Sequence, residues 1–433
     1  MDARRQDPRL RVSAEAVRPA ADAHREGTFP ARGDGAPGAV QGLSAGAWQD
    51  SDVPTTSLPQ PVGVAEFFAG IGLMARGLEL RGFRVDWAND IEAAKRDLYL
   101  ANRPDAQKLF HLGDVRDVRG SDMPSAELAT ASFPCIDLSL AGNRKGLAGT
   151  QSGMFWEFAR VLEEMGSARP RVTLLENVHG FATSHGGQDL SKALVRMSEL
   201  GYSSDVIAIN ARHFVPQSRP RMFVIGVRND LPKGAHVGVP PLSDVRPPWV
   251  RAIFERHPEL PMHYLDLPDL PAGPEDLSGV VQRMESGDQR WWDAERTSAF
   301  VGSLSERQAA RLEALRGGNE TTWRTAYRRT RGGVATWEIR ADGIAGCLRT
   351  TGGGSSKQAL VQAGRGQVRC RWMTPLEYAR LMGAGGFKTR ARTDNQALFG
   401  FGDAVVVDVI SWIADNYLLP ALRPNGVGVS DAV

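Results

Sequence analysis

From residue 62 onward, hydrophobic positions switch repeatedly between the two-residue period of a strand and the longer period of a helix. The apolar run 62–68 predicts a strand, and the glycines after it predict a turn into a helix whose apolar face carries Leu73 and Leu78. A second strand is predicted at 83–90. Further apolar runs follow at 108–115, 128–133, 172–178, 205–210 and 221–227. Short strands that alternate with helices are typical of a doubly wound, mostly parallel α/β sheet, here of at least six strands.

The α/β pattern stops near residue 232, where proline-rich segments begin. It returns at Thr374, which forms a predicted capping box with Glu377. A last helix is predicted to begin at Asp403 as its cap, because apolar residues recur after it at helical spacing. We therefore divide the chain into five parts. A disordered leader (1–60) precedes an α/β domain (61–232) and a second domain (233–370). A segment that returns to the first domain (371–422) and a tail (423–433) follow.

The composition indicates a globular protein with reduced cysteines. The chain has 433 residues, 42% of them hydrophobic, and no uncharged apolar run approaches the roughly 18 residues of a membrane span. Its three cysteines, Cys135, Cys347 and Cys370, lie far apart and form no CxxC pair, so we expect neither a bound metal nor a disulfide. We expect a cytoplasmic protein without a membrane partner.

The formal net charge of +2 hides an uneven distribution. Residues 233–320 carry 10 Lys and Arg against 14 Asp and Glu, whereas residues 321–371 carry 10 against 2. The second segment interleaves its arginines with Trp323, Tyr327 and Trp337, a pattern that suits contacts with nucleic-acid phosphates and bases. On charge alone, a solvated arginine-rich surface fits equally well.

The ends of the first three predicted strands indicate a nucleoside pocket. Glycines in FFAGIGLMARG, residues 67–77, follow a strand and open a helix, where backbone amides can approach a ligand. Asp90 ends the next strand about 20 residues later, where a carboxylate can accept both ribose hydroxyls. Asp114 ends the strand after that. The sequence contains no GxxxxGK[ST] motif, so a nucleoside cofactor is favoured over a triphosphate.

Cys135 follows the next strand, in TASFPCIDLS (130–139), and is the candidate nucleophile. A free cysteine is more often a small buried hydrophobic residue. Here Pro134 ends the strand, and a glycine-rich polar loop with Arg144 and Lys145 follows, a setting that lowers the pKa of a thiol. Cys135 would therefore lie beside the predicted pocket as a reactive thiolate.

Glu176 follows an apolar strand, where burial raises the pKa of a carboxyl group and lets it act as a general acid. A capping or ion-pair role is the alternative for this residue. Arg219 and Arg221 stand two residues apart at a strand start, with Gln217 in register, so both are expected to point to one side. Two fixed guanidinium groups on one face suit an anion or a carbonyl oxygen.

The order of these residues resembles that of the DNA (cytosine-5) methyltransferase family. The resemblance runs from about residue 62 to residue 420 and rests on the motifs EFFAGIGL, WANDIEAA, GDV, PCIDLS, ENV, PQSRPR, TPLEYARLMG and FGFGDAVVVDVI. Several motifs in one order are more specific than any single one. The resemblance implies a Rossmann-like methyltransferase sheet with a smaller, irregular target-recognition domain at 233–370.

The resemblance also implies a chemistry. By similarity, Cys135 would attack carbon 6 of a cytosine flipped out of the duplex while Glu176 holds a proton on ring nitrogen 3. Arg221 would hold the cytosine carbonyl oxygen, and Arg219 would brace the flipped nucleotide's phosphate or the catalytic loop. Carbon 5 would then take a methyl group from S-adenosyl-L-methionine. The residues implied to hold this cofactor are Phe68, Gly70, Gly72, Asp90 and Asp114.

The basic segment then becomes the expected DNA face. The loop 139–155, with Arg144 and Lys145, would close over the duplex. In the target-recognition domain, 233–320 would be largely scaffold. The expected DNA contacts there are Arg324, Arg328, Arg329, Arg331, Arg340 and Arg349. The implied partners are double-stranded DNA of a specific sequence and, as a candidate, a cognate restriction endonuclease, and we expect a monomer associated with the nucleoid.

The chain departs from the family pattern at Ile136, Asp137, Gln151 and Asp403, and two other functions stay open. Asp137 adds a negative charge near the proposed thiolate, whereas Asp403, where the family usually has asparagine, keeps a residue that caps helices well. A related branch of the family methylates cytosine in transfer RNA, although the long segment between PQSRPR and TPLEYARL favours DNA. A catalytically silent DNA-binding relative is the second alternative, and intact Cys135 and Glu176 argue against it.

Overall fold

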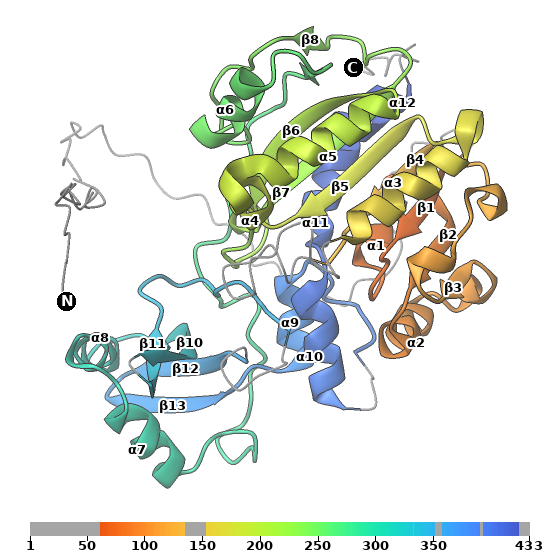
Figure 1. Ribbon diagram of the computed structural model, residues 1–433. Helices are drawn as coiled ribbons and strands as arrows, with labels where there is room; N and C mark the ends of the chain where they lie inside the picture. The colour runs from red at the N-terminus through yellow and green to blue at the C-terminus, as the bar shows by residue number, and fades with distance from the viewer. Residues whose placement is uncertain (1–60, 135–152, 332, 351–356, 390–392, 424–433) are drawn as a thin grey trace, which may run out of the picture. The chain divides into compact units, whose positions relative to one another are not determined.

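The computed structural model describes residues 61–134, 153–331, 333–350, 357–389 and 393–423 (Figure 1). The side chains of Thr330, Arg331 and Ala335 also lie outside this description. Contacts within the chain define two units, and every described residue belongs to the second, Pro54–Val433. The expected leader at 1–60, the candidate nucleophile Cys135 with its neighbour Asp137, and the loop residues Arg144 and Lys145 lie outside the described residues.

A central sheet organises the first domain. Its strands are β1 (Val62–Phe67), β2 (Phe83–Asp90), β3 (Phe110–Leu112), β4 (Leu128–Ala131), β5 (Val172–Asn177), β6 (Tyr202–Asn210) and β7 (Pro220–Arg228). Their order in space is β3-β2-β1-β4-β5-β7-β6. Strands β1 to β5 run parallel to one another, and β7 runs antiparallel to both of its neighbours. The predicted doubly wound, mostly parallel sheet is confirmed.

Helices cover both faces of this sheet because successive strand residues point to opposite sides (Figure 1). On one face, Val64 belongs to a core formed with α1 (Leu73–Glu79), α2 (Ala93–Asn102) and α11 (Val407–Ile413). On the other face, Ala65 and Phe67 belong to a core formed with α3 (Met154–Glu164) and α5 (Gln188–Glu199). The sheet is therefore the middle layer of a three-layer domain.

After a second, smaller sheet at 322–372, which we call the small domain and describe below, the chain returns to the large sheet. α9 (Pro375–Leu381) begins at Thr374 with the predicted capping box to Glu377. Further along, α11 lies against α1, where the Ser411 hydroxyl donates a hydrogen bond to the Gly77 carbonyl oxygen at 2.9 Å. A Cβ on Gly77 would lie 2.7 Å from the Cβ of Ile410, so a glycine is needed for the two helices to approach this closely.

The predicted helix cap at Asp403 is wrong. Asp403 is the last residue of α10 (Asp394–Asp403), which begins at a capping box between Thr393 and Gln396. The glycines of FGFGD continue this helix because Phe401 is buried in the core and the upstream cap fixes the first turn. The Asp403 carboxylate instead pairs with Lys95 of α2 at 3.0 Å.

One helical run in the described chain is long and apolar enough to cross a membrane. It spans Asp394–Leu422 and includes α10, α11 and α12 (Leu419–Leu422). However, 72% of its apolar window is buried inside the protein. Burial of this kind is typical of a core helix.

The second domain contains a four-stranded antiparallel sheet. Its strands are β10 (Thr322–Arg331), β11 (Val334–Ile339), β12 (Ala359–Gly364) and β13 (Gln367–Trp372), in the order β11-β10-β12-β13. α7 (Ala294–Gly302) and α8 (Glu306–Arg316) supply Phe300 and Leu312 to a small core that includes Ala326 and Cys370. This domain is more regular than the sequence predicted, because arginines on β10 conceal the strand pattern.

Short elements complete the described part of the chain. α4 (Gly180–Thr183) precedes α5, and α6 (Pro248–Arg256) adds Val250 and Phe254 to the core on the α3 side of the large sheet. β8 (His236–Val237) and β9 (His263–Tyr264) form a two-stranded ribbon.

Candidate active site

The carboxyl ends of β1 to β5 lie at one edge of the large sheet because these strands run parallel. Gly70 follows β1, Asp90 ends β2, Asp114 follows β3 and Glu176 lies next to the end of β5. β4 also ends here, four residues before Cys135, which itself lies outside the described residues. The fold thus brings the predicted cofactor residues and the predicted general acid to the same edge.

The turn between β1 and α1 has a left-handed backbone at three positions. The φ angle is 56° at Phe68, 58° at Gly70 and 87° at Gly72. At Gly72 there is also no room for a side chain, since a Cβ would lie 2.8 Å from the ring of Tyr99. Glycine adopts this conformation without steric cost, so the FAGIG sequence specifies a tight turn with an open backbone.

Asp90 ties the end of β2 to this turn. The Gly70 N–H group donates a hydrogen bond to Asp90 Oδ2 at 2.8 Å, and the Glu92 N–H group donates to Oδ1 at 2.9 Å. The side chain is mostly buried, yet each carboxylate oxygen retains a lone pair. A nucleoside cofactor fits this arrangement, because ribose hydroxyls require acceptors and the glycine turn leaves the nearby backbone uncovered.

The end of β3 is held by side-chain hydrogen bonds. The Asp114 carboxylate accepts from Arg116 Nε at 3.0 Å and Nη2 at 2.5 Å, and these bonds lower the pKa of Asp114 below its ordinary value. Asn89 Nδ2 donates to the carbonyl oxygens of His111 and Gly113, both at 2.9 Å. Sequence analysis missed Asn89, although its place beside the predicted ribose carboxylate was a usable signal.

Sequence analysis also missed a buried carboxyl group behind the glycine turn. Glu66 on β1 is 1% exposed. Its Oε1 accepts a hydrogen bond from the Ala75 N–H group, and its Oε2 accepts one from the Tyr99 hydroxyl, both at 3.1 Å. Burial raises the pKa of Glu66 to about 7, with Arg103 acting in the opposite direction. Glu66 therefore supports the start of α1, and an acidic residue inside an apolar run was the signal for it.

Glu176 and Arg221 form a largely buried ion pair. Arg221 Nε donates to Glu176 Oε1 at 2.9 Å, and the two side chains are 15% and 8% exposed respectively. The pair forms because β5 and β7 are antiparallel neighbours: Glu176 lies opposite Phe223, and Arg221 lies two residues away on the same face. A carboxyl group and a guanidinium held side by side can together engage the edge of a planar polar ring.

Arg219 is buried and committed to the protein itself. Nη1 donates to the Leu348 carbonyl oxygen at 2.8 Å and to Cys347 Sγ at 3.3 Å. Nη2 donates to the carbonyl oxygens of Gly402 at 2.9 Å and Ala404 at 2.6 Å. All four terminal N–H groups are therefore in use, and these contacts favour a positioning role over the expected phosphate contact.

Gln217 adds hydrogen bonds to the region that Arg219 contacts. Its Nε2 donates to the Leu381 carbonyl oxygen at 2.7 Å, and its Oε1 accepts from the Leu348 N–H group at 3.1 Å. The side chain is fully buried. The PQSRPR motif thus joins the segment around Leu348 to α9 beside the candidate site.

Cys347, to which sequence analysis gave no role, contacts both arginines. Its sulfur lies 3.3 Å from Arg219 Nη1 and 3.9 Å from each terminal nitrogen of Arg221. Burial raises the pKa of the Cys347 thiol, but the guanidinium groups of Arg219, Arg221 and Arg349 outweigh it, so the pKa lies below its ordinary value. Nothing in the sequence indicated this contact, because the partners are 126 and 128 residues apart.

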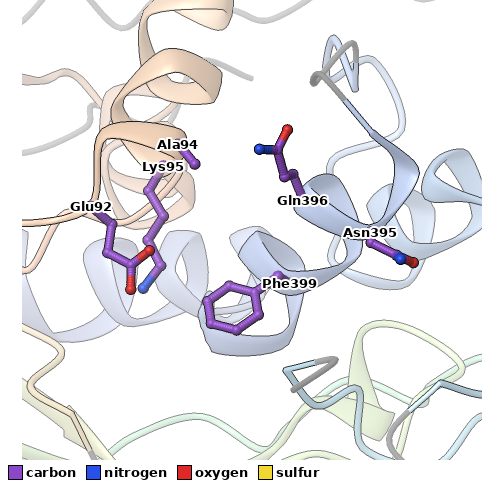
Figure 2. A pocket seen from close by; sticks show the side chains of 6 residues that line it. All are labelled: Glu92, Ala94, Lys95, Asn395, Gln396 and Phe399. Atoms are coloured by element: carbon purple, nitrogen blue, oxygen red, sulfur yellow. The ribbon is translucent and has the colours of Figure 1, made fainter. Parts of the chain in front are cut away.

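A hollow of about 280 Å³ opens between α2 and α10 (Figure 2). Its lining residues are Glu92, Ala94, Lys95, Asn395, Gln396 and Phe399. Figure 2 shows side chains from the two helices facing each other across it. It adjoins the predicted ribose carboxylate, because the Glu92 N–H group donates to Asp90, although none of the predicted cofactor residues lines it.

Comparison with protein families shows the family of this chain. The model of the family described as C-5 cytosine-specific DNA methylase matches residues 62–418, which is most of the chain. The chain belongs to this family. The resemblance drawn from the motifs is thereby confirmed.

Curated relatives of this methylase-family chain include type II methyltransferases. Type II methyltransferase M.HhaI of Haemophilus parahaemolyticus is 30% identical over 167 residues, which are 38% of this chain and 49% of the relative. Type II methyltransferase M.Eco47II of Escherichia coli is 34% identical over 174 residues, which are 40% of each chain. The chain spans about half, or less, of the length of these curated relatives.

Solved structures share the fold. The Dnmt2 methyltransferase of S. pombe is similar with a TM-score of 0.52 at 17% identity, and the methyltransferase EhMeth of Entamoeba histolytica with a TM-score of 0.56 at 14% identity. Each match covers 84% of this chain and 98% of the solved chain. At such identities the likeness concerns the fold alone.

The predicted DNA-contacting arginines of this methylase-family chain lie on different surfaces. Arg328 and Arg329 are consecutive exposed residues of β10, so their side chains point to opposite faces of the small sheet. Arg329 pairs with Glu338 at 3.3 Å, and Arg340 pairs with Asp342 at 2.6 Å. Among the described residues, Arg328 has no ion-pair partner.

The remaining basic residues of the segment differ in exposure. Arg324 is half-buried and donates to the Trp323 carbonyl oxygen at 2.8 Å, whereas Arg349 is exposed. Arg371 is fully buried against Glu377 at 2.5 Å and is no part of the surface. The high charge of 321–371 therefore overstates the basic surface that this domain presents.

Proposed function

We propose that this chain transfers a methyl group from S-adenosyl-L-methionine to carbon 5 of cytosine in double-stranded DNA of a specific sequence. One observation carries the proposal: the buried Glu176–Arg221 pair lies at the same sheet edge as the glycine turn and Asp90. Membership of the C-5 cytosine-specific DNA methylase family supports the reaction class.

The cofactor site would be the turn closed by Asp90. Asp90 would accept the ribose hydroxyls, and the backbone at Gly70 would lie against the nucleoside, with Phe68 and Asp114 beside it, while Gly72, buried against Tyr99, would shape the turn. S-adenosyl-L-methionine would supply an electrophilic methyl group. The acceptors and the open backbone in this structure match the demands of such a nucleoside.

The chain's own residues would activate the base. The Cys135 sulfur would form a bond to carbon 6 of a flipped-out cytosine, and Glu176 would hold a proton on ring nitrogen 3 so that the ring accepts the electron pair. Arg221 would hold the adjacent carbonyl oxygen. Loss of the carbon 5 proton after methylation would expel the thiolate and restore the ring. Arg219 would keep Arg221 and its surroundings in place.

The small domain would recognise the DNA sequence. Its sheet carries the exposed Arg328, and Arg349 lies exposed beside the candidate site. The type II methyltransferases among the relatives suggest a cognate restriction endonuclease as a partner in the cell. The protein would act as a monomer in the cytoplasm, at the nucleoid.

A covalent trap tests the proposal. DNA containing 5-fluorocytosine cannot lose its carbon 5 substituent, so with S-adenosyl-L-methionine it should form a stable adduct with the protein. Cys135→Ser should abolish the adduct, and Cys370→Ala, a change in the small domain's core, should retain it. Absence of an adduct with the unaltered protein would support the catalytically silent alternative.

A second assay separates the two nucleic-acid substrates. Methyl transfer is measured with duplex DNA and with transfer RNA, each at the same cofactor concentration. We expect transfer to DNA. Activity confined to RNA would overturn the DNA assignment while leaving the cytosine chemistry in place.

A further inference from the structure

Two cationic side chains lie over one tryptophan ring at the end of the small sheet. Trp372 ends β13, and its ring centroid lies 5.4 Å from the Arg296 guanidinium carbon and 5.4 Å from Lys357 Nζ. Arg296, in the first turn of α7, also lies 4.5 Å from the ring centroid of Trp292. The two ring centroids are 5.3 Å apart. The tryptophans therefore hold both cations in one place.

The rings hold these cations without cancelling their charge. A carboxylate partner neutralises a guanidinium group, whereas an aromatic ring attracts the cation and leaves its net charge unchanged. Among the described residues, neither Arg296 nor Lys357 forms an ion pair. Asp293 caps α7, and its carboxylate accepts from the Arg296 N–H group at 2.7 Å. The sequence directly before Lys357, 351–356, contains no acidic residue.

The two cations act on each other. Burial is the largest cause that lowers the pKa of Lys357, and the charge of Arg296 lowers it further, while Asp394 acts in the opposite direction. Arg296 is exposed and Lys357 is half-buried, so both groups can reach a partner outside the chain. Two like charges held near each other are stabilised by an anion that binds beside them.

The backbone next to Lys357 is tied to the candidate active site. Gln358 Nε2 donates to the carbonyl oxygens of Gly346 at 2.9 Å and Cys347 at 3.3 Å. The Cys347 sulfur in turn lies 3.9 Å from each terminal nitrogen of Arg221. A duplex that delivers a flipped-out base to Arg221 would therefore bring its flanking phosphates toward this end of the small sheet.

We propose that Arg296 and Lys357 form a contact site for the phosphate backbone of duplex DNA, held in place by Trp292 and Trp372. This inference rests on the proposed function, which makes duplex DNA the substrate. It adds to the DNA face a residue of 233–320, the segment expected to be largely scaffold. The forked guanidinium group and the compact ammonium group both suit phosphate oxygens. Phosphate contacts carry no base information, so the site contributes affinity for any duplex sequence.

Fluorescence anisotropy with a mixed-sequence DNA duplex over a salt series tests the site. The double variant Arg296→Gln/Lys357→Gln should bind about 30-fold more weakly at low salt, and its salt slope should be smaller by about 2. The matched control Arg290→Gln/Arg316→Gln removes the same charge from two arginines that each pair with a carboxylate. Its affinity should stay within about threefold. Equal affinities for the unaltered protein and the first variant, or equal losses in both variants, would overturn the proposal.

Two substitutions at Arg296 separate charge from packing. Arg296→Met keeps an apolar side chain over the rings and loses the charge, whereas Arg296→Lys keeps the charge. We expect Arg296→Lys to bind the duplex within about threefold of the unaltered protein and Arg296→Met to bind about tenfold more weakly, with similar thermal unfolding midpoints. Equally tight binding by the two variants would reduce Arg296 to a packing role and overturn the proposal.

Inorganic phosphate separates the DNA backbone from a free anion. Isothermal titration of the unaltered protein with phosphate should show no saturable binding at millimolar concentrations, because release of counterions from the polyanion supplies much of the affinity for DNA. Saturable phosphate binding that the Arg296→Gln/Lys357→Gln variant loses, together with unchanged DNA affinity, would overturn the DNA assignment of this site.

These outcomes are separable from that of the proposed function. If the protein binds duplex DNA and transfers no methyl group to it, the proposed function fails, and the anisotropy of the double variant still reports the phosphate contact. If methyl transfer occurs and the double variant binds as tightly as the unaltered protein, only the inference about Arg296 and Lys357 fails.

Discussion

Two regions of the molecule differ in how far their charged side chains are buried. The regions are the carboxyl edge of the large sheet and the sheet of the small domain. Arg219 and Arg221 are largely buried, and each makes several defined contacts, whereas Arg328 and Arg329 are exposed. The chain contains 52 Lys and Arg residues, so residue type alone does not separate the two sets. Burial turns an arginine into a fixed part of the geometry, while exposure leaves it available for a mobile, salt-sensitive partner such as a phosphate.

The largest expected difference concerns catalysis. Glu176→Gln should slow methyl transfer by about a thousandfold, because an amide cannot hold the proton on ring nitrogen 3. Cofactor binding should change little, whereas the thermal unfolding midpoint should fall, because Arg221 loses its largely buried carboxylate partner. The control is Asp288→Asn, a partly exposed acid that pairs with Arg290, which should leave the rate within about twofold. Equal rates for the two variants would remove the distinction between the acid at the candidate site and an ordinary ion-paired acid.

The next difference concerns stability. Arg219→Gln should lower the free energy of unfolding by about 3 kcal/mol, because buried carbonyl groups of Leu348, Gly402 and Ala404 lose their donors. Arg328→Gln, at an exposed position, should change it by less than about 0.5 kcal/mol. Urea denaturation measures both. If the two values agree, the buried hydrogen bonds of Arg219 contribute no more to the free energy of unfolding than an exposed arginine does.

A buried carboxyl group gives a pH-dependent test of the same edge. The pKa of Glu66 in the folded protein, about 7, lies above its ordinary value of 4.5, so the folded protein retains a proton that the unfolded chain releases. Stability should therefore fall as the pH rises from about 4.5 through about 7, by about 3 kcal/mol from this group.

The matched variant for this test is Glu66→Gln, which does not titrate. Thermal unfolding midpoints at acid and neutral pH should converge in the variant relative to the unaltered protein. Asp205, another buried acid whose pKa burial raises to about 6, is present in both proteins and cancels in the comparison. The same slope in both proteins would contradict the assignment to Glu66.

The smallest expected effects concern DNA binding by the small domain. Arg328→Gln should weaken binding about tenfold at low salt and reduce the salt slope by about 1. Arg329→Gln should do less, because Glu338 already offsets this charge. Fluorescence anisotropy over a salt series measures both variants.

A combined variant tests the whole face. Replacing Arg328, Arg329 and Arg331 together should weaken binding further and flatten its salt dependence. Unchanged affinity in the triple variant would show that these arginines form a solvated surface and not a DNA contact.

The large sheet and the residues at its carboxyl edge could be predicted because the signals are local. Each strand is a short apolar run, and the polar residue directly after it falls at the ligand edge once the strands are parallel. Gly70, Asp90, Asp114 and Glu176 were all found in this way. Their position depends on neighbours within a few residues, which the sequence displays directly.

The features that could not be predicted depend on contacts between segments far apart in the sequence. The partners of Arg219 lie 128 to 185 residues away, and no local pattern indicates that four of its N–H groups face backbone carbonyls and a sulfur. Cys347 was missed for the same reason. At Asp403 the local signal was misleading, because aspartate is a good capping residue but here ends α10, and α11 begins only at Val407 with Val406 as its cap.

The close approach of α11 to α1 has a consequence for biosynthesis. Ile410 and Ser411 cover a helix that begins at Leu73, so the apolar face of α1 stays bare while more than 300 intervening residues are translated. Domains generally fold as units during synthesis. Because α11 is translated so late, the apolar surface of the nascent β1–α1 unit stays exposed to aggregation or to a chaperone. Gly77, the residue that lets α11 pack on α1, therefore acts at a late step in the folding of this domain.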